Sequence, residues 1–225
     1  LPLKILNLGS LNIDRVYGVP HFAAEGETLL SQDYREYCGG KGLNQSIALA
    51  RAGAAVIHAG AVGEDGSVLR SLLAENGIDV RYLQQLRGPG RHAVIQVTPQ
   101  GRNAIIVHSG SNRKLTNSYI KEVLQDCLPG DLLLTQNETG GVSCAIETAK
   151  RQGMKVAVNP SPITDELFQF PLEMADFLIL NEIEGRALTG SDTTDNHKIL
   201  NRLHRRFPSA ASVLTLGEQG VLYKD

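Results

Sequence analysis

The fold class is decided by the stretch Gly42-Leu-Asn-Gln-Ser-Ile-Ala-Leu-Ala-Arg-Ala-Gly53, which is followed at once by Ala55-Val-Ile-His-Ala-Gly-Ala-Val62. In the first segment Leu43, Ile47 and Ala50 recur at helical spacing, and the closing glycine is a typical helix stop. The second segment is a continuous apolar run of strand length. A short amphipathic helix that leads directly into a buried strand indicates an α/β protein with a parallel sheet.

The same alternation runs outward from this stretch along most of the chain. The pattern predicts a second helix over Gly66–Gly77, with Val68, Leu72 and Leu73 on one face. Further strands are predicted over Lys4–Gly9, Asp131–Thr135, Met154–Val158, Phe177–Leu180 and Ser212–Leu216, and further helices over Val142–Gln152, Glu182–Thr189 and Asn196–Arg206. We therefore expect a doubly wound, mostly parallel sheet with helices on both faces.

Two stretches lack the alternation of strands and helices. Residues Val16–Tyr37 have no helical face and alternate like a strand, and Arg91–Val97 and Asn103–Val107 read as a hairpin. We interpret them as a small antiparallel β lid within residues 16–37 and 91–107, beside the main sheet. No linker rich in Pro, Gly or Ser marks a boundary, so residues 1–225 are predicted to form one α/β domain.

Composition excludes several classes of protein. The 225 residues carry 22 Lys and Arg against 24 Asp and Glu, a net charge of −2. This balance argues against nucleic acid and against an anionic membrane surface as partners. The apolar runs are too short to span a bilayer, and three cysteines without CxxC spacing disfavour disulfides and thiolate zinc sites. The first residues lack the pattern of a signal peptide, so we expect a cytoplasmic protein.

Polar residues cluster where the first predicted strand ends, which is the edge where parallel α/β sheets bind ligands. Asn12 and Asp14 are two residues apart, so their side chains share a face of an extended chain and could hold a polyhydroxy ligand. A simple turn pair explains them equally well. The glycines of Cys38-Gly-Gly-Lys-Gly-Leu-Asn44 open the first helix and allow close approach of a ligand, although the spacing is neither GxxxxGK[ST] nor GxGxxG.

Several motifs in this order and spacing resemble the ribokinase-like (PfkB) carbohydrate kinase family, and the resemblance covers essentially the whole chain. The motifs are Gly9-Ser-Leu-Asn-Ile-Asp14, Gly26-Glu-Thr28, Gly39-Gly-Lys-Gly-Leu-Asn-Gln45, Ala61-Val-Gly-Glu-Asp-Gly66, His108-Ser-Gly-Ser-Asn112, Leu134-Thr-Gln-Asn-Glu138, Val158-Asn-Pro-Ser-Pro162, Asn181-Glu-Ile-Glu184 and Thr215-Leu-Gly-Glu-Gln-Gly220. The resemblance implies a ribokinase-like fold and ATP- and Mg²⁺-dependent phosphorylation of a sugar hydroxyl. It also implies a homodimer formed through the lid.

The resemblance also assigns roles to individual residues. The sugar would contact Asn12, Asp14, Gly40, Lys41, Asn44 and Glu138, and the nucleotide would contact Asn181, Thr215, Gly217 and Gly220. Glu184 would bind Mg²⁺ through water. Because Lys41 is the only obvious cation in these motifs, we expect a neutral sugar or nucleoside as the substrate, and not a phosphosugar.

Two alternatives accompany these assignments. Asn181 and Glu184 have the spacing of a helix capping box, which explains them without any ligand. The family's catalytic motif, D-T-x-G-A-G-D, has no counterpart up to Asp225, so we expect the aspartate that acts as general base to lie beyond that residue. The competing hypothesis is a catalytically inactive regulator that binds a sugar.

Overall fold

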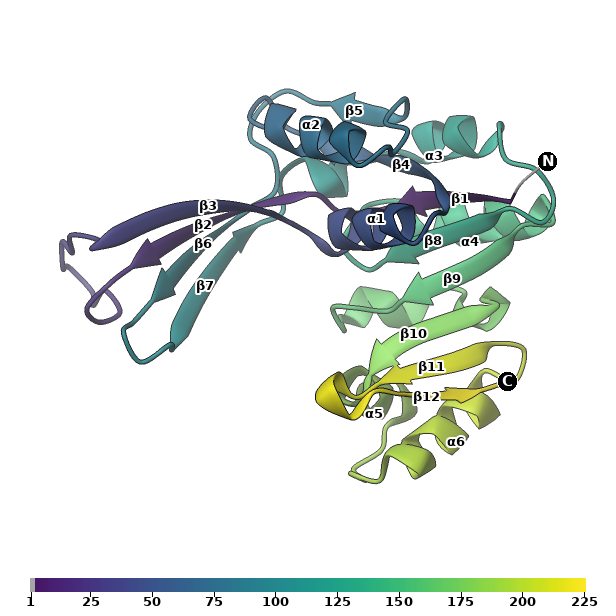
Figure 1. Ribbon diagram of the computed structural model, residues 1–225. Coiled ribbons are helices and arrows are strands. Elements are labelled where there is room, and N and C mark those ends of the chain that lie inside the picture. The colour runs from purple at the N-terminus through teal and green to yellow at the C-terminus, as the bar shows by residue number, and fades with distance from the viewer. Residues whose placement is uncertain (1–2) are drawn as a thin grey trace.

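Two sheets of different size make up the β structure of the computed structural model, which describes residues 3–225 (Figure 1). The larger sheet has eight strands in the order β12-β11-β10-β9-β8-β1-β4-β5, and its pairs are parallel except for β11–β12. Its strands are β1 (Lys4–Leu8), β4 (Ala55–Val62), β5 (Leu83–Gln85), β8 (Leu132–Gln136), β9 (Lys155–Asn159), β10 (Phe177–Asn181), β11 (Ala211–Thr215) and β12 (Val221–Lys224). The predicted mostly parallel sheet is confirmed.

Helices cover both faces of this sheet, as the sequence predicted (Figure 1). On one face, Leu43 and Leu73 pack with Val56 of β4; on the other, Leu6 and Leu8 of β1 join the core formed by the later helices. The helices are α1 (Lys41–Arg51), α2 (Ser67–Glu75), α3 (Asn117–Leu124), α4 (Val142–Arg151), α5 (Glu182–Thr189) and α6 (Asn196–Arg206). Four short 3₁₀ helices are η1 (Gly110–Lys114), η2 (Asp165–Gln169), η3 (Leu172–Met174) and η4 (Gly217–Gln219).

The smaller sheet projects away from the main sheet as a lid (Figure 1). It has the order β3-β2-β6-β7 and consists of β2 (Asn12–Gly18), β3 (Asp33–Gly39), β6 (His92–Val97) and β7 (Asn103–His108). Its outer pairs are antiparallel, as predicted, and the central pair β2–β6 is parallel. Both central strands therefore leave the main sheet in the same direction, and their first residues lie together at the base of the lid.

Three local expectations from the sequence are corrected. Residues 19–32 form no strand, because only the end residues of this segment, Val19 and Gln32, hydrogen-bond to the backbone of the lid strands. The helix predicted over Gly66–Gly77 turns Val68 outward, 50% exposed, and buries Leu69 with Leu73. Helix α3 was not predicted. The hydroxyl of Thr116 caps it by accepting a hydrogen bond from the Tyr119 N–H.

None of the helices formed by residues 3–225 has both the length and the apolar character needed to cross a membrane.

Candidate active site

The turn between β1 and β2 is packed directly against the start of α1. A Cβ atom on Gly42 would lie 2.4 Å from backbone atoms of Gly9 and Ser10, so position 42 has no space for a side chain. The N–H of Leu43 donates to the Ser10 carbonyl at 3.0 Å. Gly40 precedes the helix at φ 104°, a conformation that suits glycine. These contacts hold the two glycine-containing motifs at one edge of the sheet.

Buried amides beneath this turn fix its position. The Asn7 amide donates to the Gly42 carbonyl and to the Ser46 hydroxyl, both at 2.8 Å, and accepts from the Gln136 amide at 2.9 Å. Gln136 also donates to Gln45 at 2.6 Å. The Asn7–Gln136 bond joins β1 to β8, and the other three bonds join these strands to α1, so the network fixes the distance of α1 from the sheet.

The same network ends at His58, whose Nδ1 lies 2.8 Å from the Ser46 hydroxyl. Full burial lowers the pKa of His58 from 6.5 to about 4. Between pH 6.5 and pH 4, His58 is protonated in the unfolded chain but stays neutral in the folded protein. The free energy of unfolding should therefore fall as the pH is lowered, by up to about 3 kcal/mol at pH 4. His58→Phe should remove this part of the pH dependence in urea unfolding at pH 7.5, 5.5 and 4.5.

The control for this experiment is His197→Phe, at an exposed position of α6. It should leave the pH dependence of the wild type unchanged. Identical slopes for His58→Phe and the wild type between pH 6.5 and 4 would contradict the prediction.

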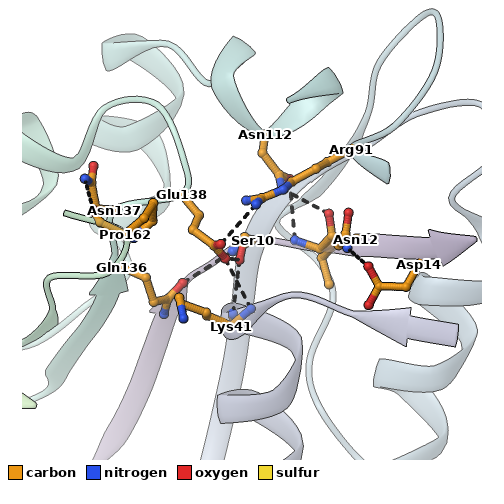
Figure 2. Close-up of polar contacts among 12 residues, drawn as sticks. Ser10, Asn12, Asp14, Lys41, Arg91, Asn112, Gln136, Asn137, Glu138 and Pro162 are labelled. Carbon is orange, nitrogen blue, oxygen red and sulfur yellow. Dashed lines mark hydrogen bonds and ion pairs between the residues drawn. The ribbon is translucent and has the colours of Figure 1, made fainter. Parts of the chain in front are cut away.

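Glu138 lies just beyond β8 and is the centre of the polar cluster (Figure 2). Its Oε2 accepts hydrogen bonds from the Ser10 hydroxyl and, at 3.3 Å, from the Lys41 backbone N–H. Its Oε1 lies 3.0 Å from Nη2 of Arg91, and the two side chains are 10% and 17% exposed. A carboxylate with three such partners is held in one orientation.

Asn12 and Asp14 face the cluster from the first residues of β2 (Figure 2). The Asn12 amide donates to the Asp14 carboxylate, which confirms that the two side chains share a face. Burial raises the pKa of Asp14, and the Asn12 hydrogen bond and the charge of Arg91 offset part of that rise. Oδ1 of Asn12 and Nε of Arg91 are buried and have no hydrogen-bond partner among the described residues. An acceptor and a donor are thus free for a ligand.

The structure brings together most of the predicted sugar-binding residues. Asn12, Asp14, Lys41 and Glu138 meet at this edge, with Gly40 at the start of α1, whereas Asn44 lies exposed one turn further along.

Sequence reasoning did not single out Ser10, Arg91, Asn112 and Gln136. Asn112 binds both backbone groups of Leu11, donating to its carbonyl at 3.0 Å. Lys41 is the only obvious cation within the motifs, and Arg91, which lies outside them, adds a second cation to the site.

The predicted nucleotide-binding residues form a second cluster on strands further along the sheet. Asn181 ends β10 beside Thr215 of β11 in the parallel register. Gly217 and Gly220, at φ 58° and 90°, make the tight loop that follows β11. Asn181 and Glu184 form the predicted capping box of α5, with both hydrogen bonds at 2.9 Å. Strands are about 4.8 Å apart, so roughly 10 Å separate β8 from β10.

Comparison with known proteins defines the class of this protein. Residues 3–225 match the family described as pfkB family carbohydrate kinase. The chain therefore belongs to the PfkB family of carbohydrate kinases, which transfer a phosphoryl group to a sugar hydroxyl. The expected enzyme class, a phosphotransferase with an alcohol group as acceptor, is confirmed.

Within this family the chain is similar to ribokinases. It is 36% identical to the ribokinase of Haemophilus influenzae over 95% of this chain and 72% of that protein. It is 30% identical to the deoxyribokinase of Salmonella typhi over 98% of this chain and 74% of that protein. The crystal structure of ribokinase from Cryptococcus neoformans in complex with ADP superposes with a TM-score of 0.85 at 29% identity, over 99% of this chain and 76% of that one.

Proposed function

We propose that the protein phosphorylates a neutral sugar, with ribose as the first substrate to test, and that ATP is the phosphoryl donor. One observation carries the proposal: Asn12, Asp14 and Glu138 converge at the carboxyl edge of the sheet, where ligands of α/β proteins bind. The names of the ribokinase relatives and the ADP complex of the Cryptococcus neoformans enzyme support ribose and ATP.

On the sugar side, each proposed residue supplies a different kind of hydrogen bond. Asp14 accepts from sugar hydroxyls, and Asn12 offers the buried Oδ1 that has no partner in the described structure. Glu138 accepts from the opposite side, while Gly40 lets the backbone approach, and Lys41 and Asn44 donate from α1. A sugar that satisfies these groups is oriented with one hydroxyl toward the nucleotide. This positioning is the main contribution of these residues to phosphoryl transfer.

On the nucleotide side, we assign Asn181, Thr215, Gly217 and Gly220 to ATP and Glu184 to Mg²⁺. Glu184 uses Oε2 for the helix cap, so its other carboxylate oxygen remains for a metal-bound water. Residues 3–225 contain no group of three or more His, Cys, Asp or Glu side chains placed to hold a metal. This fits Mg²⁺, which needs few protein ligands and keeps several waters. Bound Mg²⁺ would neutralise charge on the phosphates.

The test measures ADP release by the full-length gene product with ATP, Mg²⁺ and either ribose, 2-deoxyribose, fructose or adenosine. We expect ribose to give the highest kcat/KM. A protein that binds ribose but never releases ADP above the sugar-free rate would favour the inactive regulator, and absence of ribose binding would reject the sugar assignment.

We also propose a homodimer formed through the lid. The lid face that carries Asp14 also presents Tyr37, Ile105 and Val107, each about half exposed. A four-stranded sheet with one apolar face needs a partner surface. Sedimentation should show a dimer at tens of micromolar, and Ile105→Glu with Val107→Glu should convert it to a monomer. A wild-type protein that stays monomeric at 100 µM would contradict this proposal.

A further inference from the structure

Arg91 stands at the junction between the lid and the main sheet. It directly precedes β6, and its carbonyl accepts a hydrogen bond from the Ile13 N–H of β2 at 3.1 Å. The residue before it, Gly90, donates to the Asp65 carboxylate at 2.8 Å. A Cβ atom on Gly63 would lie 2.0 Å from the Gly90 nitrogen, so the two backbones are in close contact and position 63 has no space for a side chain. These contacts anchor the backbone beside Arg91 to the main sheet.

The guanidinium of Arg91 contacts the Glu138 carboxylate (Figure 2), and its charge also acts on Asp14. Nη2 is 3.0 Å from Glu138, and its positive charge lowers the pKa of Asp14 against the effect of burial. The formal charges of Arg91 and Glu138 cancel in a largely buried pair. Such a pair adds little net stability, because desolvation offsets the attraction, but removing either partner would leave an uncompensated buried charge.

One donor of this guanidinium is not used by the protein. Nε of Arg91 is buried and has no hydrogen-bond partner among residues 3–225. A buried donor without a partner is costly, so groups of this kind are found where a ligand or water completes them. Oδ1 of Asn12 is also buried without a partner among these residues, and it is an acceptor. A sugar hydroxyl both donates and accepts, and could therefore serve both.

We propose that Arg91 is a specificity-determining residue of the sugar site. It donates a hydrogen bond to a substrate hydroxyl, and its ion pair with Glu138 makes the site select uncharged sugars over sugar acids. This inference rests on the proposed function. Two consequences separate it from a merely structural role. Removing Arg91 weakens ribose binding, and removing the charge of Glu138 leaves Arg91 free to attract an anionic ligand.

The experiment measures binding of ribose and of ribonate, the carboxylate analogue, by calorimetry. For ribose, Arg91→Met should raise Kd by about 30-fold and Arg91→Lys by about 10-fold, since lysine keeps the charge but lacks the fork that reaches two partners. Ribonate should bind Glu138→Gln at least about 10-fold more tightly than it binds the wild type. The double variant Arg91→Met with Glu138→Gln should lose that gain. Arg102→Met, an exposed arginine at the lid tip, is the matched control and should behave as the wild type.

A pH profile adds a second readout. Because Arg91 lowers the pKa of Asp14 and Glu138 raises it, Arg91→Met should move the midpoint of the pH dependence of ribose binding to higher pH. Circular dichroism and the urea midpoint establish that each variant is folded.

The outcomes distinguish this inference from the proposed function. If the wild type does not bind ribose, the proposed function fails. If the wild type binds ribose and Arg91→Met binds it equally well, Arg91 is not a specificity residue. If ribonate binds the wild type and Glu138→Gln with the same Kd, the ion pair does not select against anions. An unshifted pH midpoint in Arg91→Met would likewise overturn the assignment.

Discussion

Asp14→Ala should raise the Kd for ribose by about 100-fold or more, because two hydroxyls would lose hydrogen bonds to a charged acceptor, each worth about 1.5–3 kcal/mol. The change also leaves the Asn12 amide without the partner it has in the structure. Asp14 lies on β2 and is only partly buried, so the fold should survive. Calorimetry with ribose, together with circular dichroism, measures both effects.

The matched control is Asp33→Ala, which removes a carboxylate from the same face of the lid at its far end. Asp33 stands opposite Gly18 in the register and pairs with Arg35 in solvent. Ribose affinity should not change in this variant. Asp14→Asn tests the charge itself: affinity of the wild type should fall as the pH is lowered toward the raised pKa of Asp14, and the asparagine variant should lose this dependence. A folded Asp14→Ala protein with wild-type affinity would reject the role of Asp14.

Much of the main sheet could be predicted because parallel strands are buried on both faces. Continuous apolar runs such as Ala55–Val62 therefore mark them in the sequence. Helix α3 has a less regular signal in the sequence, because only Leu115 separates its cap, Thr116, from the 3₁₀ helix Gly110–Lys114. The loop 19–32 has no helical face, which led us to interpret it as part of a strand, yet only its two ends bond to the backbone of the lid strands, and a missing helical pattern alone cannot show this.

The same reasoning explains which site residues were found. Asn12, Asp14 and Glu138 follow predicted strands within recognisable motifs, so their position at one edge of the sheet could be inferred. Arg91 belongs to no such motif. Its contact with Glu138 depends on the parallel pairing of β6 with β2, which brings the start of a hairpin back to the main sheet. That pairing joins segments far apart in the chain, and no local pattern specifies it.

The amide network shows a further limit of sequence reasoning. Asn7 interrupts an otherwise apolar strand, and Gln136 ends another, so each could be read as a solvated residue. In the structure both are fully buried and bonded to each other and to α1. Their role is to hold Gly42 and the turn at Ser10 at a fixed separation, and that separation leaves no space for a side chain.

Gly42→Ala is the most demanding test of this packing, because two effects would change the free energy of unfolding in opposite directions. Helix propensity favours alanine over glycine by about 1 kcal/mol in a helix interior. Against that, the added methyl group would lie 2.4 Å from the backbone of Gly9, which cannot rotate away as a side chain can. We expect overpacking to prevail, with the free energy of unfolding lowered by about 2–4 kcal/mol. Urea unfolding gives the sign directly.

The variant should also lose ribose affinity by about 10-fold or more under conditions where it remains folded, because misplaced donors forfeit their hydrogen bonds. Moving α1 from Ser10 weakens the bonds of the Leu43 N–H to the Ser10 carbonyl and of the Lys41 N–H to Glu138. Gly18→Ala is the control in the lid, where the new methyl group would lie 3.2 Å from the Asp33 Cβ and 3.4 Å from the Asp33 nitrogen, a much looser fit than at Gly42. Ala48→Gly, at an exposed position of α1, measures the effect of helix propensity alone, and should lower the free energy of unfolding by about 1 kcal/mol. If Gly42→Ala is as stable as the wild type and binds ribose equally well, the close contact between α1 and the turn does not control the site.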